Sequence, residues 1–329
     1  MKFLYVLILT AMSVAARAQQ VRSICKVFPL NGNEKWDYLN VNNNRLFVSH
    51  GNQVQILDVI TGSEIANIKG LEGVHGIAVD EASNYGFISN GMRNNVVVFD
   101  NKTYKVVDSI PTGKKPDAIV FEPFSQSVIV GNGSGNSLTV IEGKTLKVTA
   151  TIPLEGNPEY IVSDREGLAF VNIENKNEIA VIDMKALTLK KYIKLLPEGE
   201  EPRGLAMDVK NKLLFVGCGN GKLIIVDAKA EKVINVQPIG MGCDGVAYNS
   251  ITQYIYTSNK DGTLSIIHQK MDNTFEKMPS ISTQFGCKTL ALDEKANVVY
   301  TSGALLVKSG EDAAKMDIVP GSFKVFVIK

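Results

Sequence analysis

Seven polar residues, six of them charged, recur about 40 residues apart, each at the start of a short apolar run. They are Asp37, His75, Asp117, Glu159, Arg203, Asp244 and Lys288. Brought to one point, such residues could bind a polar ligand or transfer protons. The chain contains no H-x-x-H or H-E-x-x-H spacing, so we predict no metal and no cofactor.

The sequence leaves catalysis open. It contains no G-x-S-x-G elbow, no P-loop and no dinucleotide fingerprint. We expect a binding protein for a small polar ligand, a glycan or an envelope protein. The alternative is a lactonase- or lyase-type enzyme for a sugar-derived acid, in which His75 with Asp117 or Glu159 transfers protons and Arg203 clamps the anion.

A structural interpretation of the same charges stands beside both functions. Arg203 falls between Glu159 and Asp244 in repeat order, and Lys288 falls between Asp244 and Asp37. The charges would then neutralise one another around a wet channel and bind nothing.

Two further residues extend the candidate ligand site. Trp36, the only tryptophan, directly precedes Asp37 and would form an apolar wall, or else pack between structural elements. His50 occupies a position where other repeats have asparagine, as at Asn90, Asn132 and Asn259, a residue typical of turns. We place both at the same end of the expected channel as the seven recurring residues.

Short β-rich runs must position these residues. In the second repeat, residues 76–80, 85–90, 95–99 and 103–110 are apolar or alternating, and polar turns separate them. Four such runs predict an antiparallel sheet of four strands. Seven copies predict an all-β, seven-bladed propeller whose first strands line the channel.

The second runs carry a recognisable motif. Tyr256-Thr257-Ser258-Asn259 and Tyr300-Thr301-Ser302 come close to Y-V-T-N, and Phe47-Val48-Ser49-His50 and Phe87-Ile88-Ser89-Asn90 match it more loosely. In these runs the chain resembles the YVTN-repeat seven-bladed β-propeller family of bacterial and archaeal envelope and surface-layer-like proteins. The resemblance covers nearly all of the chain after residue 18. It implies the fold rather than one activity, because similar propellers include binding proteins, lactonases and lyases.

The two ends of the chain predict how the ring closes. The last repeat lacks a fourth run, and residues 21–30 resemble the fourth runs of other repeats. We expect 21–30 to be the outer strand of blade 7. Residues 303–321 form a connection longer than its counterparts, which we expect to overhang the channel mouth as a lid.

The first 18 residues read as a signal peptide. A lysine precedes an apolar stretch, and Ala16-Arg17-Ala18 predicts cleavage after Ala18. We therefore expect residues 19–329 to be a single exported domain, periplasmic or secreted, and a monomer. The 35 basic and 34 acidic residues nearly balance, which argues against nucleic acid as a partner, and no second long apolar run predicts a membrane span.

Export makes disulfides permissible. Cys218, Cys243 and Cys287 fall on the mouth side of consecutive repeats, whereas Cys25 falls in the closing strand. A Cys243–Cys287 or Cys218–Cys243 bridge is a candidate, provided that the Cα atoms come within about 7 Å.

Overall fold

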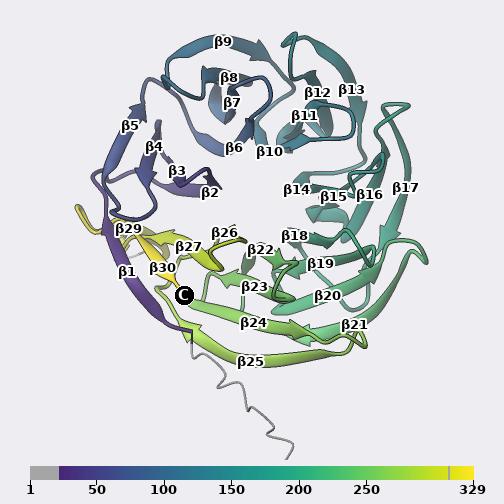
Figure 1. Ribbon diagram of the computed structural model, residues 1–329. Helices are drawn as coiled ribbons and strands as arrows, with labels where there is room; N and C mark the ends of the chain where they lie inside the picture. Colours follow the sequence, from purple (N-terminus) through teal and green to yellow (C-terminus); the bar gives the residue numbers. More distant parts are fainter. Residues whose placement is uncertain (1–21, 310–311) are drawn as a thin grey trace, which may run out of the picture.

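The computed structural model describes residues 22–309 and 312–329 of the chain. Over these residues, seven four-stranded antiparallel sheets stand as blades around a central channel (Figure 1). The predicted all-β, seven-bladed propeller is confirmed.

The blades follow one another along the chain. Blades 1 to 3 consist of β2 (Trp36–Asn42), β3 (Arg45–His50), β4 (Gln53–Asp58) and β5 (Glu64–Ile68); β6 (Val74–Asp80), β7 (Tyr85–Asn90), β8 (Asn95–Asp100) and β9 (Val106–Pro111); and β10 (Pro116–Glu122), β11 (Ser127–Asn132), β12 (Ser137–Glu142) and β13 (Val148–Pro153). Blades 4 to 6 consist of β14 (Pro158–Ser163), β15 (Leu168–Ile173), β16 (Glu178–Asp183) and β17 (Thr188–Lys194); β18 (Pro202–Asp208), β19 (Leu213–Cys218), β20 (Lys222–Asp227) and β21 (Lys232–Pro238); and β22 (Cys243–Asn249), β23 (Tyr254–Asn259), β24 (Thr263–Gln269) and β25 (Phe275–Ser282). Blade 7 consists of β26 (Leu290–Asp293), β27 (Val298–Gly303), β30 (Lys324–Ile328) and β1 (Ile24–Pro29), and short 3-10 turns η1 (Gly91–Arg93), η2 (Gly133–Gly135) and η3 (Glu174–Lys176) follow three second strands.

Burial explains the pattern of the runs. The second and third strands of a blade are buried on both faces, as in β19, because neighbouring blades cover them. Outer strands such as β9 are mostly exposed, so their sequences are more polar. Each hydrophobic cluster of the described residues therefore joins two adjacent blades, as where Leu46 and Val48 of blade 1 pack with Val325 of blade 7.

The N-terminal strand closes the ring. In blade 7, β1 pairs antiparallel with β30, with Phe28 opposite Val325, and Figure 1 shows the purple and yellow ends of the chain side by side. Backbone hydrogen bonds between Ser23 and Lys329 (3.0 and 3.1 Å) extend the pairing. The expected ring closure by this strand agrees with the structure.

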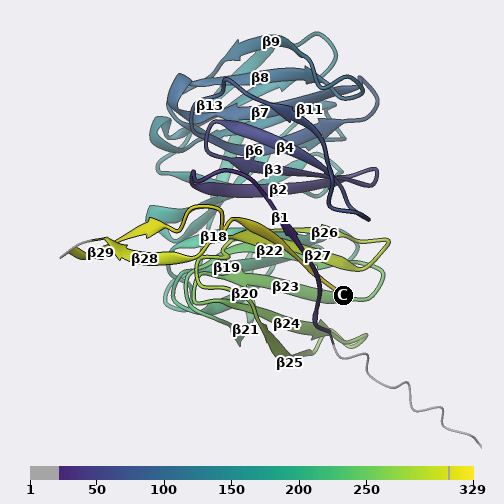
Figure 2. The same cartoon turned by 90° about the vertical axis from the view of Figure 1, so that its left-hand side faces the viewer.

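The long connection of blade 7 contains a hairpin. β28 (Leu306–Ser309) pairs with β29 (Asp312–Ile318), and the hairpin projects beyond the ring on one side (Figure 2). Residues 306 and 316–318 lie at the channel mouth.

The N-terminal 21 residues are outside the described part of the chain, so the signal peptide and the cellular location stay predictions. Among residues 22–309 and 312–329, no helix is long and apolar enough to cross a membrane.

Candidate ligand-binding site

The inner strands bend where the recurring residues lie. Six of the seven described inner strands shift register there; β6, for example, shifts between Val74 and Ile77, at His75. An irregularity of this kind interrupts the ladder and turns side chains away from the strand face. It turns these side chains toward the channel; the position of the residues was predicted from the repeat, but the register shift was not.

Second strands hold the bends in place. Ser49 donates a hydrogen bond to the backbone oxygen of His75 in the next blade. Ser89 and Ser258 do the same for Asp117 and Cys287, at 2.5 and 2.9 Å. In blades 1, 2 and 6 the serine of the YVTN-like run therefore fastens the inner strand of the next blade, which gives the motif a structural role there.

All seven recurring residues line one cavity of about 1310 Å³ at the channel mouth. We call Asp37, His75, Asp117, Glu159, Arg203, Asp244 and Lys288 the ring residues and this space the mouth cavity. Trp36 also lines it, as do Leu306 and Ile318 of the hairpin segment. The sequence thus placed these residues at one end of the channel, and the hairpin adds apolar surface beside them.

His50 does not line the mouth cavity. It is fully buried, its ring stacks on Phe323 with centroids 3.9 Å apart, and its two nitrogens lie 3.1 Å from Gln55 Oε1 and 3.0 Å from the Glu34 backbone oxygen. Burial lowers the pKa of His50. The loop between β1 and β2 covers this histidine, so it fixes that loop, much as Asn90 binds the Glu72 backbone in the next blade.

The expected disulfides are absent: all four cysteines are free thiols. Each of the three buried ones fills a separate packing site over a glycine. A Cβ added to Gly217 would lie 2.4 Å from the Cys243 sulfur, and one on Gly303 would lie 2.5 Å from that of Cys287. Burial raises the pKa of Cys218 to about 12 and that of Cys287 to about 11, so both remain protonated.

One side of the ring is a chain of ion pairs. Lys288 Nζ lies 2.6 Å from Asp244 Oδ2 and 3.6 Å from Asp37 Oδ1. His75 Nδ1 donates a 2.6 Å hydrogen bond to Asp37 Oδ2 and lies 3.7 Å from Asp117 Oδ1. The expected contact of Lys288 with two acids is therefore present.

These contacts set the protonation of the groups. Burial would raise the pKa of Asp37, but Lys288 and His75 together outweigh it and lower that pKa. Burial raises the pKa of Asp117 to about 6 despite the proximity of His75. Burial would lower the pKa of His75, but Asp37 and Asp117 raise it.

Arg203 departs from the expectation. It does not pair with Glu159 or Asp244; its Nε and Nη2 donate to Glu174 (2.7 Å) and Glu201 (2.9 Å). Glu174 belongs to η3, a turn outside the recurring positions. Glu159 is left without a hydrogen bond or ion pair to any residue in the described part of the chain. Burial and the neighbouring acids Asp117 and Asp244 raise its pKa to about 9.

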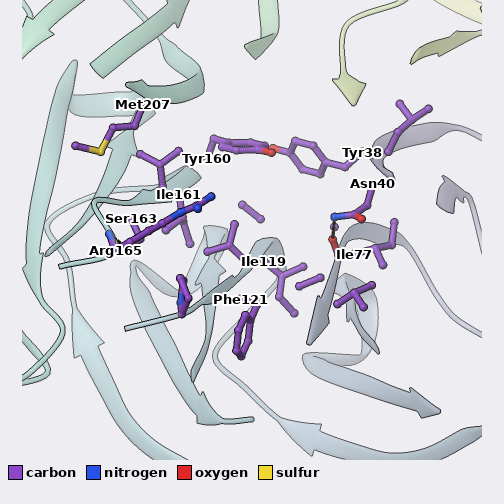
Figure 3. A pocket seen from close by; sticks show the side chains of 18 of the residues that line it. Tyr38, Asn40, Ile77, Ile119, Phe121, Tyr160, Ile161, Ser163, Arg165 and Met207 are labelled. Atoms are coloured by element: carbon purple, nitrogen blue, oxygen red, sulfur yellow. Dashed lines mark hydrogen bonds between the residues drawn. The ribbon is translucent and has the colours of Figure 1, made fainter. Parts of the chain in front are cut away.

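Two tyrosines form the floor of the mouth cavity. Tyr38 and Tyr160 meet edge to face across the channel, with ring centroids 5.6 Å apart (Figure 3). Tyr38 lines the mouth cavity and also a second cavity of about 560 Å³ deeper in the channel, which Tyr160 lines as well. The floor therefore lies between a charged upper space and a lower one lined largely by apolar residues such as Ile119 and Met207.

Comparisons with known proteins agree with the fold. A family model described as YNCE-like beta-propeller matches residues 56–239. Similar solved structures include U3-55K, with 9% identity and a TM-score of 0.76 over 93% of this chain and 99% of that one. The WD40 repeats of RRP9 are similar with 8% identity and a TM-score of 0.78 over 94% of this chain and 99% of that one. Hydrazine synthase from Kuenenia stuttgartiensis is also similar, with 14% identity and a TM-score of 0.71 over 88% of this chain and 96% of that one. At these identities the likeness shows the fold alone, and no curated protein matches the chain.

Proposed function

Because the chain belongs to the YNCE-like beta-propeller family, we propose that it is an exported propeller that binds a small polar ligand in the mouth cavity. The fold of the family does not by itself determine an activity. Export rests on the predicted signal peptide. The site rests on the convergence of the seven ring residues on one concave space.

The charges of the ring indicate the ligand class. Lys288 is bound to Asp244, and Arg203 is bound to two glutamates. Both ring cations are thus occupied by acids, whereas the Glu159 carboxyl lines the cavity without a described partner. A ligand that presents hydrogen-bond donors, such as a polyol, a neutral sugar or an amine, suits this surface better than an acid.

The same contacts favour binding over the lactonase or lyase alternative. An anion clamp would need a free Arg203, but its guanidinium already serves two carboxylates. His75 Nδ1 is hydrogen-bonded to Asp37, and its Nε2 lies beside Gly91. The Arg203 guanidinium is therefore not free to clamp a sugar-derived acid in this arrangement.

A thermal-shift screen tests the proposal. Neutral sugars, polyols, amines and sugar acids are added separately to the wild type, to Glu159→Gln and to Glu81→Gln. Glu81 is an exposed turn residue between β6 and β7, at the opposite end of the strands from the mouth. We expect a donor-rich compound to raise the melting temperature of the wild type and of Glu81→Gln, and to raise that of Glu159→Gln clearly less.

Two results would overturn this assignment. If no small compound stabilises the wild type, a protein or large glycan becomes the better-supported partner. If a sugar acid is consumed, and His75→Ala abolishes the turnover, the protein is an enzyme.

A further inference from the structure

We propose that Asp37, His75 and Asp117 bind a divalent first-row transition metal ion such as Zn²⁺ or Mn²⁺. The site lies at one side of the ring and does not depend on the organic ligand proposed above. No short sequence motif predicts this site, because its three residues come from three different blades.

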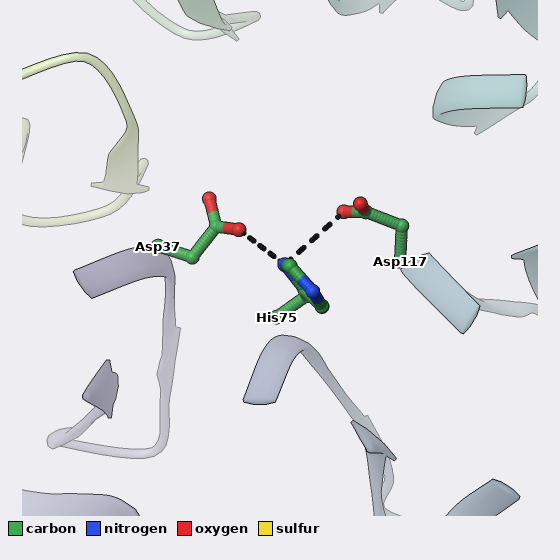
Figure 4. Close-up of side chains that lie close together, drawn as sticks. All are labelled: Asp37, His75 and Asp117. Carbon is green, nitrogen blue, oxygen red and sulfur yellow. Dashed lines mark hydrogen bonds and ion pairs between the residues drawn. The ribbon is translucent and has the colours of Figure 1, made fainter. Parts of the chain in front are cut away.

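The geometry brings three ligand atoms together. The side chains extend from β2, β6 and β10, and one atom of each lies within 4.8 Å of the other two. Figure 4 shows the two carboxylates on either side of the imidazole. Atoms that share one metal at about 2.0–2.2 Å lie roughly 3–4 Å apart. The 2.6 and 3.7 Å separations from His75 Nδ1 therefore need only small side-chain rotations.

Asp117 gives an independent indication. It is 9% exposed, yet its carboxylate makes no hydrogen bond to any residue that the structure describes. The nearest cationic nitrogens are His75 Nδ1 at 3.7 Å and Lys115 Nζ at 4.0 Å. A buried carboxylate without donors is costly, and a metal ion between Asp117 and His75 would satisfy it.

The orientation of His75 supports coordination through a single nitrogen. Nδ1 faces both carboxylates (Figure 4), whereas Nε2 lies beside Gly91, where an added Cβ would be 2.9 Å from it. A proton on Nδ1 can bond well to only one carboxylate, and it is Asp37 that receives it at 2.6 Å. A metal in place of that proton would hold all three groups at once.

Charge and chemistry define the ion. Two carboxylates balance a divalent cation, and Lys288 can stay on Asp244, its closer partner. One imidazole with two carboxylates favours a transition metal over Ca²⁺ or Mg²⁺, which prefer oxygen ligands alone. Three protein ligands leave coordination positions open toward the mouth cavity for water.

Calorimetric titration of the chelator-treated, metal-free protein with ZnCl₂ and with MnCl₂ tests the site, in the absence of any organic ligand. We expect one ion to bind per chain. His75→Ala and Asp117→Asn should each weaken binding at least about 100-fold, since loss of a ligand exceeds the effect of an outer-shell change. His268→Ala, which removes a histidine stacked on Tyr254, should bind like the wild type.

A second measurement keeps the test decisive if a variant misfolds. Crystals of the wild type soaked in ZnCl₂ should give an anomalous scattering peak between these three side chains. The proposal is overturned if the wild type binds neither ion, if both well-folded variants bind as tightly as the wild type, or if the peak lies elsewhere. None of these outcomes bears on the polar ligand, which the separate thermal-shift screen tests.

Discussion

Replacing Glu159 with glutamine should change how the stability of the propeller depends on pH. The pKa of this carboxyl rises from 4.5 to about 9 in the folded chain, because burial and neighbouring acids disfavour its charge. Between these values the folded chain holds a proton that the unfolded chain has lost. The free energy of unfolding therefore falls as the pH rises through this window.

The structure bounds the size of the effect. The full shift corresponds to about 6 kcal/mol at 1.36 kcal/mol per pKa unit. Glu159 is only partly buried, and water in the mouth cavity screens its neighbours. We therefore expect the ionisation of Glu159 to lower the free energy of unfolding by about 2 kcal/mol. Glutamine keeps the shape and never ionises, so Glu159→Gln should match the wild type near pH 4.5 and be about 2 kcal/mol more stable at pH 9.

Urea denaturation of both proteins from pH 4.5 to 9 measures this difference. Taking the difference cancels the other titrating groups, and Glu81→Gln controls for the loss of any surface carboxylate. Our account of the ring is refuted if Glu159→Gln shows the same pH profile as the wild type, or if it is the less stable protein at pH 9.

Three further predictions concern the rest of the molecule. Phe28→Ala should lower the free energy of unfolding by about 3 kcal/mol, because this 4% exposed ring of the closing strand packs over Gly62 of blade 1. Val27→Ala, at a 43% exposed position of the same strand, should lower it by less than about 0.5 kcal/mol. Equal effects of the two changes in urea denaturation would contradict the observed closure. Lys288→Met should lower the free energy of unfolding by about 1–2 kcal/mol at pH 7, because it leaves Asp37 and Asp244 without their cation. The 35% exposure of the lysine side chain limits this loss. An unchanged denaturation midpoint would mean that these ion pairs do not form. In a thiol titration, the native protein should expose only Cys25 and the denatured protein all four cysteines; fewer than four thiols after denaturation without reductant would reveal a disulfide.

The fold could be predicted because its information repeats. Every copy of the 40-residue unit contains the same order of strands. The second and third strands of each blade are buried on both faces, which requires the apolar runs seen in the sequence. The equivalent position of each ring residue follows from the same register. For this reason Glu159 and Lys288 could be assigned to one mouth although they are 129 residues apart.

The contact of Lys288 with two acids was predicted, but the partners of Arg203 were not, because they depend on local departures from the repeat. Arg203 finds Glu174 in a 3-10 turn that only some blades have. His50 is removed from the mouth by the loop that joins the closing strand to blade 1. The thiols fill spaces over glycines, and strand spacing alone does not reveal such spaces.

The closing strand has a consequence for the order of folding. Cys25 of β1 bonds to the backbone of Val327, 302 positions later in the chain. β1 is therefore made long before its partner β30 exists, and its backbone edge stays unpaired while the intervening blades assemble. A contact between such distant segments is slow to form. Completion of the ring should thus be a late kinetic step, during which the waiting strand is open to chaperones, proteases or the edge of another chain.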